Sequence, residues 1–264
     1  MELSVIIINF GMEDKVIVCI ESLLETQRRV DYEIIVVNKP NPRSQIDCLK
    51  QFRGQFALGG LPPIRLINYN QFGVGKMRNI GIKNALGEYL LMLDADTEVV
   101  DDLSDLLTFI RNHPLCGAVG VKLLTPDGNL QYSCRTFYDL RTVIFRRTFL
   151  SKLLPNHRIQ RQHLMMDFDH NDVRRVDWVQ GAFLLMRRQA IADVGLFDEF
   201  SPFGLEDVSW CWRAHKRGWH IYYFPQVRVI HHYQRSSYSI KSKRFFEHLL
   251  AFLKFIFKYG LPKV

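Results

Sequence analysis

The chain has 264 residues, 47% hydrophobic and 23% charged, a composition typical of one large globular domain with appendages that excludes wholesale disorder. Its formal net charge is +8, and no apolar run reaches the roughly 18 to 20 residues that a membrane-spanning helix needs. We expect no secretory signal, because the first residues lack a basic region and a small-residue cleavage site. Five scattered cysteines without metal-ligand spacing are expected to be reduced thiols of a cytosolic protein.

The first half of the chain alternates strand-like and helix-like segments. Continuous apolar runs predict buried strands at residues 4–8, 33–37, 64–67, 89–93 and 116–121. Apolar residues at helical spacing predict helices at 14–27, 75–85 and 103–112. This order is typical of a doubly wound α/β sheet, which binds ligands at the carboxyl ends of its strands.

The second half is less regular. Residues 125–175 are basic, polar and poorly periodic, so we predict a flexible or inserted segment there. Order resumes with an apolar run at 176–186. Helical patterns follow at 189–194 and 206–217, and a strand at 221–229.

The positive charge is concentrated in two segments. Residues 135–163 and 235–264 each hold seven basic residues and one acid, so each carries +6 and the remainder carries −4. Such segments seek an anionic partner: a phospholipid surface, a pyrophosphate or a nucleic acid.

The last segment, 236–264, has the pattern of a basic amphipathic helix. Its apolar residues recur at helical spacing, at Phe245, Leu249, Phe252 and Ile256, and one position later at Phe246, Leu250, Leu253 and Phe257. Arg244, Lys254 and Lys258 flank them. A membrane-surface anchor has this composition, and so does a terminal helix docked on the core with its cations at the rim. The pattern leaves both alternatives open.

Two carboxylates, Asp94 and Asp96, follow the strand predicted at 89–93. An Asp-x-Asp pair at a strand end can hold Mg²⁺ or Mn²⁺ through oxygen, and the cation in turn binds a diphosphate. A helix-capping Asp with a solvated neighbour is the alternative interpretation.

Acids and histidines also stand at the ends of later elements. Glu206 and Asp207 begin a helical run, where the helix dipole favours acids and where one could serve as a general base. His231 and His232 close the last strand, which fits a structural role or a metal or phosphate contact.

The glycine-rich stretch 70–81 fails as a P-loop, because Met77 follows Lys76, and as a dinucleotide fingerprint, because Arg78 takes the third glycine position. It could still place Lys76, Arg78 and backbone amides beside a phosphate.

The order of these pieces is more specific than any one of them. The segments Ser4–Asn9, Cys19–Leu23, Glu33–Val37, Asn70–Gly81 and Gly87–Asp96 together resemble the family 2 inverting glycosyltransferases. The second half resembles the rhamnosyltransferase-like branch of that family, in the segments Val176–Arg188, Val194–Glu199, Glu206–Val208, Cys211–Arg213 and Pro225–His232.

The resemblance implies a GT-A fold over residues 1–235, with a nucleotide-sugar half at 1–122, an acceptor half at 123–235 and a helical tail at 236–264. It implies that Asp94 and Asp96 bind Mg²⁺ or Mn²⁺ on the donor diphosphate, with His231 as a further contact. Asp207 would deprotonate the acceptor hydroxyl, with Glu206 beside it.

The resemblance also implies two groups of binding residues. Those on the donor side are Asn9, Asn38, Lys76, Arg78, Asn79, Ala95 and Trp178. Those on the acceptor side are Gln180, Gly181 and Arg213, with Arg213 near the diphosphate or orienting Asp207.

The chain departs from the family pattern at two positions. Asn38 and Ser209 stand where the family usually has acids. Asn38 can hydrogen-bond a nucleobase without offering charge, so the resemblance does not imply one nucleotide.

The hypothesis that follows is a metal-dependent inverting glycosyltransferase, peripheral on the cytoplasmic face of the cell membrane. It would move a sugar, with rhamnose as the first expectation, from a dTDP- or UDP-sugar to a glycan or lipid-linked acceptor in surface polysaccharide synthesis. We expect no nucleic acid in the main cleft, because Asp94, Asp96 and Asp207 would repel a polyanion.

Two other classes of function are open. A sugar nucleotidyltransferase would share the sheet but should have a glycine-rich basic loop after the first strand, where this chain has Asn9–Glu13. A non-catalytic protein that binds sugar nucleotides is the other alternative.

Overall fold

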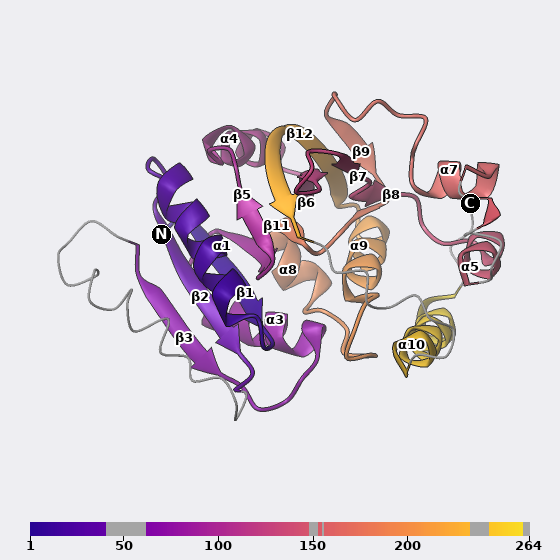
Figure 1. Cartoon of the computed structure of the whole chain (residues 1–264), viewed down its shortest axis with the longest axis horizontal. Helices are drawn as coiled ribbons and strands as arrows, with labels where there is room; N and C mark the ends of the chain where they lie inside the picture. Colours follow the sequence, from indigo (N-terminus) through magenta and orange to yellow (C-terminus); the bar gives the residue numbers. More distant parts are fainter. Residues whose placement is uncertain (41–61, 148–152, 155, 233–242, 261–264) are drawn as a thin grey trace.

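The computed structural model describes residues 1–40, 62–147, 153–154, 156–232 and 243–260. A mixed sheet crosses the molecule, with helices on both of its faces and α5, α7 and α10 gathered at one end (Figure 1). Its strand order is β3-β2-β1-β4-β11-β6-β12-β5. These strands are β1 (Leu3–Asn9), β2 (Tyr32–Asn38), β3 (Ile64–Asn68), β4 (Tyr89–Asp94), β5 (Thr97–Val99), β6 (Cys116–Leu124), β11 (Phe183–Arg187) and β12 (His220–His231).

Four short strands lie outside this order. β7 (Leu130–Gln131) pairs with β6, and β9 (Arg174–Val176) pairs with β12. β8 (Cys134–Arg135) and β10 (Trp178–Val179) form a separate two-stranded sheet.

Helices on each face bury an apolar stripe against the sheet. α1 (Glu13–Thr26) and α4 (Ser104–Asn112) share one core with the sheet. α3 (Val74–Asn84), α8 (Arg188–Val194), α9 (Glu206–Lys216) and α10 (Lys243–Tyr259) contribute to the core on the other face. α5 (Leu140–Arg147) and α7 (Arg158–His163) lie beyond the sheet, above α10 in Figure 1.

The strand order reverses next to β1, which places polar residues at one edge. β1, β2, β3 and β4 run parallel, with Asn9 opposite Asn38 and Asn38 opposite Asn68 in register, while Ile8 lies opposite Asp94. A reversal of strand order leaves a crevice at the carboxyl ends of the strands, the usual ligand site of such sheets. β11, from the second half of the chain, runs antiparallel between β4 and β6, so both halves share one sheet.

The strands and helices predicted for the first half are confirmed to within a few residues. The described part of the stretch 125–175, which we predicted to be flexible or inserted, holds β7, β8, α5, α7 and most of β9. Elements of two to eight residues are too short to establish a period along the sequence. Within the described ranges, no helix combines the length and hydropathy that crossing a bilayer requires.

Among the described residues, Cys19, Cys116, Cys134 and Cys211 are buried free thiols. Burial raises the pKa of Cys19, Cys116 and Cys134 to about 12, so these side chains are inert thiols, as the scattered spacing predicted. Cys48 lies outside the described residues.

Candidate active site

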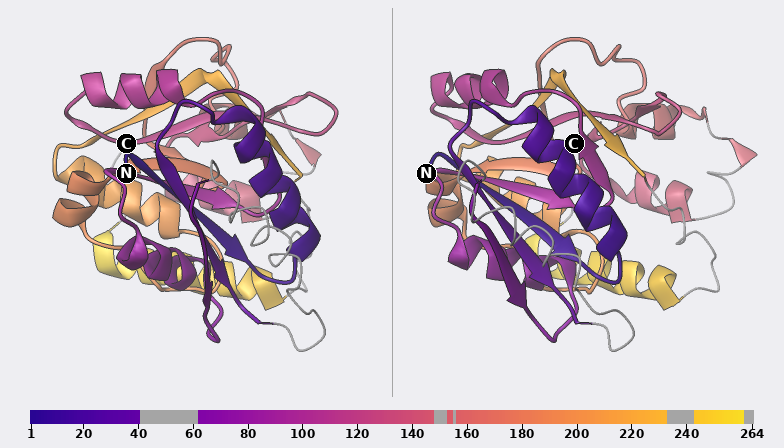
Figure 2. Two further views of the ribbon diagram at one scale, coloured as in Figure 1. Left: turned by 90° about the vertical axis from the view of Figure 1, so that its left-hand side faces the viewer. Right: turned by 60° about the vertical axis from the view of Figure 1, so that its left-hand side comes forward.

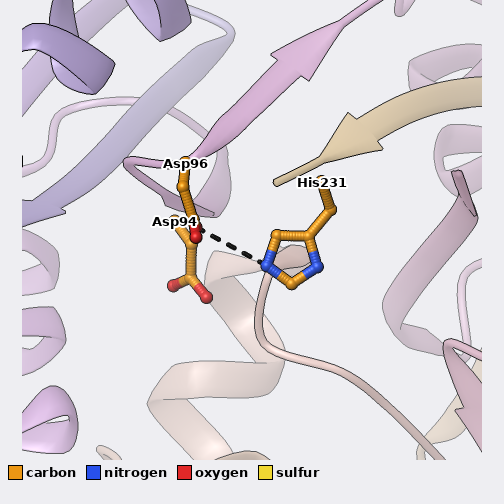
Figure 3. Close-up of side chains that lie close together, drawn as sticks. All are labelled: Asp94, Asp96 and His231. Atoms are coloured by element: carbon orange, nitrogen blue, oxygen red, sulfur yellow. Dashed lines mark ion pairs between the residues drawn. The ribbon is translucent and has the colours of Figure 1, made fainter. Parts of the chain in front are cut away.

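Three ligand-type side chains converge where β4 and β12 end (Figure 3). One ligand atom from each of Asp94, Asp96 and His231 lies within 4.8 Å of the other two, and His231 Nε2 is 3.5 Å from Asp96 Oδ1. The pairing of β5 with β12 sets His231 opposite Thr97, and the His232 amide donates to the Asp96 carbonyl at 2.8 Å. The predicted trio is therefore assembled by strand pairing across the chain.

Gln131 orients the His231 ring, a role that sequence reasoning missed. Its Oε1 lies 3.0 Å from His231 Nδ1, and its Nε2 donates to the His231 carbonyl at 2.7 Å. Since an amide oxygen only accepts, Nδ1 carries a proton, and Nε2, which faces Asp96, either carries a second proton or offers a lone pair to a cation. A lone pair facing a carboxylate oxygen is favourable only with a proton or a cation between them. The donor set of two carboxylates and one imidazole therefore fits a divalent cation such as Mn²⁺ or Mg²⁺.

The two carboxyls differ in environment. Burial raises the pKa of Asp94 above its usual range, against the charges of Arg78 and His231. Burial acts in the same direction on Asp96, but the hydrogen bond and charge of His231 outweigh it and bring the pKa of Asp96 below its usual range.

Arg78 connects this trio to α9 from inside the protein. Its side chain is 2% exposed, and its guanidinium donates to Glu206 Oε1 at 2.9 Å, to Asp94 Oδ1 at 2.9 Å and to the Gly181 carbonyl at 2.7 Å. Although burial opposes its charge, Asp94, Glu206 and Asp207 together raise the pKa of Arg78, so it stays protonated. Arg78 is therefore held by two acids and one carbonyl of the protein.

The chain enters α9 through a left-handed turn at Gly204 and Leu205, with φ of 77° and 70°. Such a backbone conformation is uncommon for leucine and is found where surrounding structure enforces it. The turn places Glu206 and Asp207 in the first turn of the helix, where the dipole favours acids.

The two acids of α9 face different surroundings. Glu206 is buried on Arg78, and burial, followed by the charge of Asp207, raises the pKa of Glu206 to about 7. Asp207 is half-buried, and its Oδ2 and Oδ1 accept the amides of Gly181 and Val208 at 3.0 and 2.8 Å. Each oxygen keeps a second lone pair, so the carboxylate is held in place and can still accept a proton. Of the two acids, Asp207 is the one that can meet a ligand.

Gly181 lies between these groups and has no room for a side chain. Its amide donates to Asp207 and its carbonyl accepts from Arg78, while a Cβ at this position would lie 2.3 Å from Arg78 Nη1. The expected position of Gly181 near the junction is consistent with this geometry. Gln180, beside it, is half-buried, and its backbone N–H donates to the Ser133 carbonyl at 2.8 Å.

Two of the residues expected to bind ligand are engaged elsewhere. Asn79 is buried, and its amide exchanges hydrogen bonds with Phe197 and Glu199. Trp178 is buried, and its Nε1 donates to the Thr136 carbonyl at 2.9 Å. Their side chains bond to protein groups and support the structure around the site. The motifs in the sequence do not by themselves indicate this role.

Arg213 is the clearest correction. Its guanidinium donates to the carbonyls of Val194 and Leu196 at 2.7 and 2.6 Å, and its Nε is 3.4 Å from Asp198. It lies six residues after Asp207 on α9, about 9 Å along the helix and on a different side of it. Arg213 therefore holds the segment 194–198 rather than orienting Asp207, while its expected place near the diphosphate stays a prediction.

The donor-side residues on β1 and β2 form a ladder of amides. Asn9 Nδ2 donates to Asn38 Oδ1 at 3.0 Å, and Asn38 Nδ2 donates to Asn68 Oδ1 at 2.8 Å. Asn9 and Asn38 are buried, and Asn68 is the exposed end of the ladder. The side-chain amide of Asn38 therefore accepts from Asn9 and donates to Asn68. An asparagine in place of the usual acid thus links the ends of β1, β2 and β3.

Aromatic rings cluster just beyond the end of β1, where Phe10 follows Asn9. The ring of Phe72 lies 4.2 Å from that of Phe10 and 4.7 Å from that of Phe203, between centroids, and Lys39 Nζ lies 4.9 Å from the Phe10 centroid. Sequence reasoning missed this cluster, because the aromatic residues come from three separate loops.

Lys76, expected at a phosphate, donates to Gln71 at 3.1 Å on the surface, and Ala95 packs into the core with α1.

The second departure from the family pattern has a local explanation. Ser209 is fully buried in α9 and donates to the Glu206 carbonyl at 3.1 Å. A carboxylate at this depth would lose its hydration, which is costly for a charged group, so the uncharged hydroxyl suits the position.

Curated relatives point to one family. The chain is 29% identical over 216 residues to the O-antigen biosynthesis protein RfbC of Myxococcus xanthus, covering 81% of this chain and 16% of that protein. It is 27% identical over 263 residues to the rhamnosyltransferase WbbL of Escherichia coli K12, covering 96% of this chain and 91% of that protein. The chain spans less than half of the length of several other relatives. One of them is an N-acetylglucosaminyl-diphospho-decaprenol L-rhamnosyltransferase of Mycobacterium tuberculosis, to which the chain is 31% identical over 132 residues. This match covers 50% of this chain and 42% of that protein.

Solved structures agree on the fold. GalNAc-T7 with UDP, GalNAc and Mn²⁺ superposes with a TM-score of 0.69 at 17% identity, covering 97% of this chain and 47% of that one. The mannosyltransferase PcManGT of Pyrobaculum calidifontis, with GDP-Man and Mn²⁺, gives 0.64 at 15% identity, covering 99% and 66%. These likenesses confirm the predicted GT-A glycosyltransferase fold.

The family described as "Glycosyltransferase like family 2" matches residues 2–246 of the chain. A match of this extent, over a fold and a site that carry the expected motifs, shows that the chain belongs to glycosyltransferase family 2.

Proposed function

We propose that the protein is a metal-dependent inverting glycosyltransferase that uses a nucleotide-diphosphate sugar and transfers the sugar to an acceptor hydroxyl. The observation that carries the proposal is the placement of half-buried Asp207 next to the Asp94, Asp96 and His231 trio, with Arg78 and Gly181 between them. A base and a cation site held in one rigid frame are what transfer with inversion needs, because attack and departure occur on opposite faces of the sugar.

Asp94, Asp96 and His231 would hold Mn²⁺ or Mg²⁺. When bound, the ion offsets the charge that develops on the leaving diphosphate. Gln131 fixes the His231 ring so that Nε2 faces the ion site.

Asp207 would take the proton of the acceptor hydroxyl. The Gly181 and Val208 amides hold its carboxylate in a single orientation, and a positioned base of this kind contributes typically 10²–10⁴-fold to a rate. Glu206, turned inward to Arg78, would position rather than react.

For the donor we propose a dTDP- or UDP-sugar, with rhamnose as the first sugar to test. Relatives named as rhamnosyltransferases support the sugar, and the amide ladder with the Phe10 and Phe72 rings offers hydrogen bonds and stacking to a nucleobase. For the acceptor we propose a glycan or a lipid-linked sugar in cell-surface polysaccharide synthesis, met by a protein peripheral on the inner face of the cell membrane.

The first experiment is a thermal-shift panel of UDP, dTDP, GDP and ADP, each with and without Mn²⁺. Stabilisation by UDP or dTDP that requires Mn²⁺ supports the donor site. Stabilisation by ADP alone, or by no nucleotide in a folded sample, counts against it and favours the non-catalytic alternative.

The base is tested with Asp207→Asn, which keeps the carbonyl oxygen that accepts the Gly181 amide. We expect nucleotide binding to persist and kcat to fall about 10²–10⁴-fold. Asp105→Asn, an exposed acid in the first turn of α4, is the matched control and should keep the wild-type rate. Product NMR then reads the anomeric configuration. A retained configuration, or an unchanged rate in Asp207→Asn, would remove the proposed mechanism, and release of inorganic pyrophosphate would instead point to a nucleotidyltransferase.

A further inference from the structure

Helix α10 is docked on the protein by one of its faces. Ala251, Phe252 and Phe255 are buried in the core that also holds α9, and the Phe252 ring lies 6.0 Å from that of Tyr138 between centroids. The Tyr259 hydroxyl contacts both oxygens of Asp198 at 3.0 and 2.9 Å, and Lys258 donates to the same carboxylate at 2.9 Å. The docked-helix alternative left open by the sequence thus describes the inner face of α10.

The outer face of α10 is apolar as well. Leu250, Leu253 and Phe257 are 53%, 54% and 95% exposed, and their spacing of three and four residues lines them up along one side of the helix. A helix that only covered the core would turn polar residues to water on this side. We therefore expect this outer stripe of Leu250, Leu253 and Phe257 to contact a binding partner.

A second exposed apolar group lies at the same end of the molecule. Leu140 and Ile144 on α5 are exposed one turn apart, and Leu153 and Leu154 are exposed shortly after that helix. Tyr138, next to α5, contacts Phe252 of α10, and both figures place the two helices side by side (Figures 1 and 2). Seven of the fourteen large apolar side chains exposed among the described residues belong to these two groups. Such a concentration marks an interaction surface.

The charge of the two segments to which α5 and α10 belong identifies the class of partner. α5 and α10 belong to the segments 135–163 and 235–264, each of which carries +6 while the rest of the chain carries −4. Arg141, Lys254 and Lys258 are exposed beside the apolar side chains. Exposed apolar side chains can insert a few ångströms into the headgroup region of a bilayer, and cations beside them bind anionic headgroups. The combination of the two is typical of a surface that binds an anionic bilayer. A protein partner of ordinary composition would not require an excess of one charge.

We propose that the outer stripe of α10 and the exposed apolar residues of α5 and 153–154 form one composite surface, here called the α5/α10 face, that docks on an anionic phospholipid bilayer. The inference rests on the proposed function for its purpose, since α10 is anchored to Asp198 next to the acceptor half of the site. It goes beyond a C-terminal anchor, because it makes α5 an equal part of the contact and keeps α10 folded on the protein while it binds.

The test is flotation of the full chain with vesicles of phosphatidylcholine, with and without phosphatidylglycerol. Leu250→Ser/Leu253→Ser/Phe257→Ser removes the α10 stripe, and Leu140→Ser/Ile144→Ser removes the α5 group. Leu86→Ser/Leu115→Ser is the matched control, because these leucines are equally exposed but precede β4 and β6. We expect each patch variant to lower partitioning roughly tenfold or more, and the control to bind like the wild type.

Binding should require phosphatidylglycerol and weaken with salt. Wild-type binding by either patch variant overturns the composite face. Equal binding to phosphatidylcholine alone overturns the electrostatic part. A concentration-dependent dimer in sedimentation that the patch variants abolish makes a second copy the occupant and also overturns the proposal.

The nucleotide thermal shift separates this proposal from the proposed function. Patch variants that keep the Mn²⁺-dependent shift of the wild type are folded at the site, so their vesicle result judges the surface alone. If no variant and no wild type binds a nucleotide, the proposed function fails while flotation still decides the α5/α10 face.

Discussion

Arg78 and Asp94 form an ion pair inside the protein, with 2.9 Å between Nη2 and Oδ1. The same guanidinium reaches Glu206 at 2.9 Å, so the end of β4 and the start of α9 share one buried cation. Any shift of the ion site relative to Asp207 must therefore break or stretch this bridge. The geometry makes Arg78 the residue that sets the distance between the two halves of the proposed chemistry.

We expect Arg78→Met to lower the free energy of unfolding by about 3–5 kcal/mol, because it leaves the buried carboxyl of Glu206 and the half-buried carboxyl of Asp94 without a cation. Arg78→Lys should recover part of the stability but little of the rate, since one ammonium cannot span three acceptors in fixed geometry. Urea denaturation and kcat measure the two effects. Arg217→Met, which removes an exposed pair with Asp193, is the control and should cost no more than about 1 kcal/mol. A wild-type rate in Arg78→Lys would contradict the bridge.

Gly181→Ala should impair catalysis beyond its effect on stability. The added methyl would lie 2.3 Å from Arg78 Nη1, so the guanidinium or the peptide that holds Asp207 must move. The control is Gly87→Ala, whose methyl would lie 2.5 Å from the Ser4 nitrogen of β1. Gly87 precedes the start of β4, whereas Asp94 is at the other end of that strand. We expect both variants to lose stability, but only Gly181→Ala to lose kcat per folded molecule. Equal kcat values for the two would refute the role of Gly181.

Gln131→Leu should weaken the ion site without removing a ligand. The variant lacks the side-chain oxygen that accepts from His231 Nδ1–H. Removal of a hydrogen-bond partner of a metal-ligating histidine typically lowers metal affinity 10–100-fold. Titration of activity with Mn²⁺ should show this shift in half-saturation, with most of the rate restored at high Mn²⁺. Gln189→Leu, on the exposed side of α8, should titrate like the wild type. An unchanged Mn²⁺ requirement in Gln131→Leu would mean that His231 is oriented by other groups.

His163 makes the fold sensitive to acid. Burial lowers the pKa of His163 well below its usual range, and the charges of Arg146 and Arg135 lower it further. The unfolded chain therefore binds the extra proton first, and stability present above pH 6.5 is lost as the pH falls below it, by up to about 1.4 kcal/mol per pH unit.

His163→Phe keeps a ring against Tyr138 and Trp178 and should flatten the fall in stability between neutral pH and pH 5. Urea denaturation across this range measures it. His157→Asn, on the exposed N-cap of α7, replaces the capping ring nitrogen by a capping oxygen and should follow the wild-type curve. If His163→Phe loses stability with acid as steeply as the wild type, the buried ring is not the sensor.

Local patterns along the chain predicted most of the elements that carry the site. Apolar runs predicted β1, β2 and β4 because buried parallel strands are apolar on both faces. The end of the run at Asp94 predicted a polar group at the carboxyl edge of the sheet, and the acids of α9 were predicted by their place at a helix start. These features depend on neighbours in the sequence, so a single sequence is enough to find them.

Contacts between distant segments were not accessible in this way. Gln131 sits on a strand of two residues, and nothing in the sequence around it indicates that β7 lies against the end of β12. Arg78 looked like a surface phosphate contact, because its neighbours form a glycine-rich basic loop. Arg213 looked like a site residue because its motif follows Asp207 closely, yet the turn of the helix carries it to another side.

The sequence by itself determined the alternation of strands and helices, the acids at their ends, the two basic segments and the family that the motifs resemble, because each of these is a property of composition or local period. Only the tertiary structure decided that β5 and β12 bring Asp96 to His231, that Arg78 is buried between Asp94 and Glu206, and that α10 has a docked face and an exposed one. The reason is physical: which side chains meet is set by strand register and helix packing, and those are determined by burial over the whole chain rather than by any one segment.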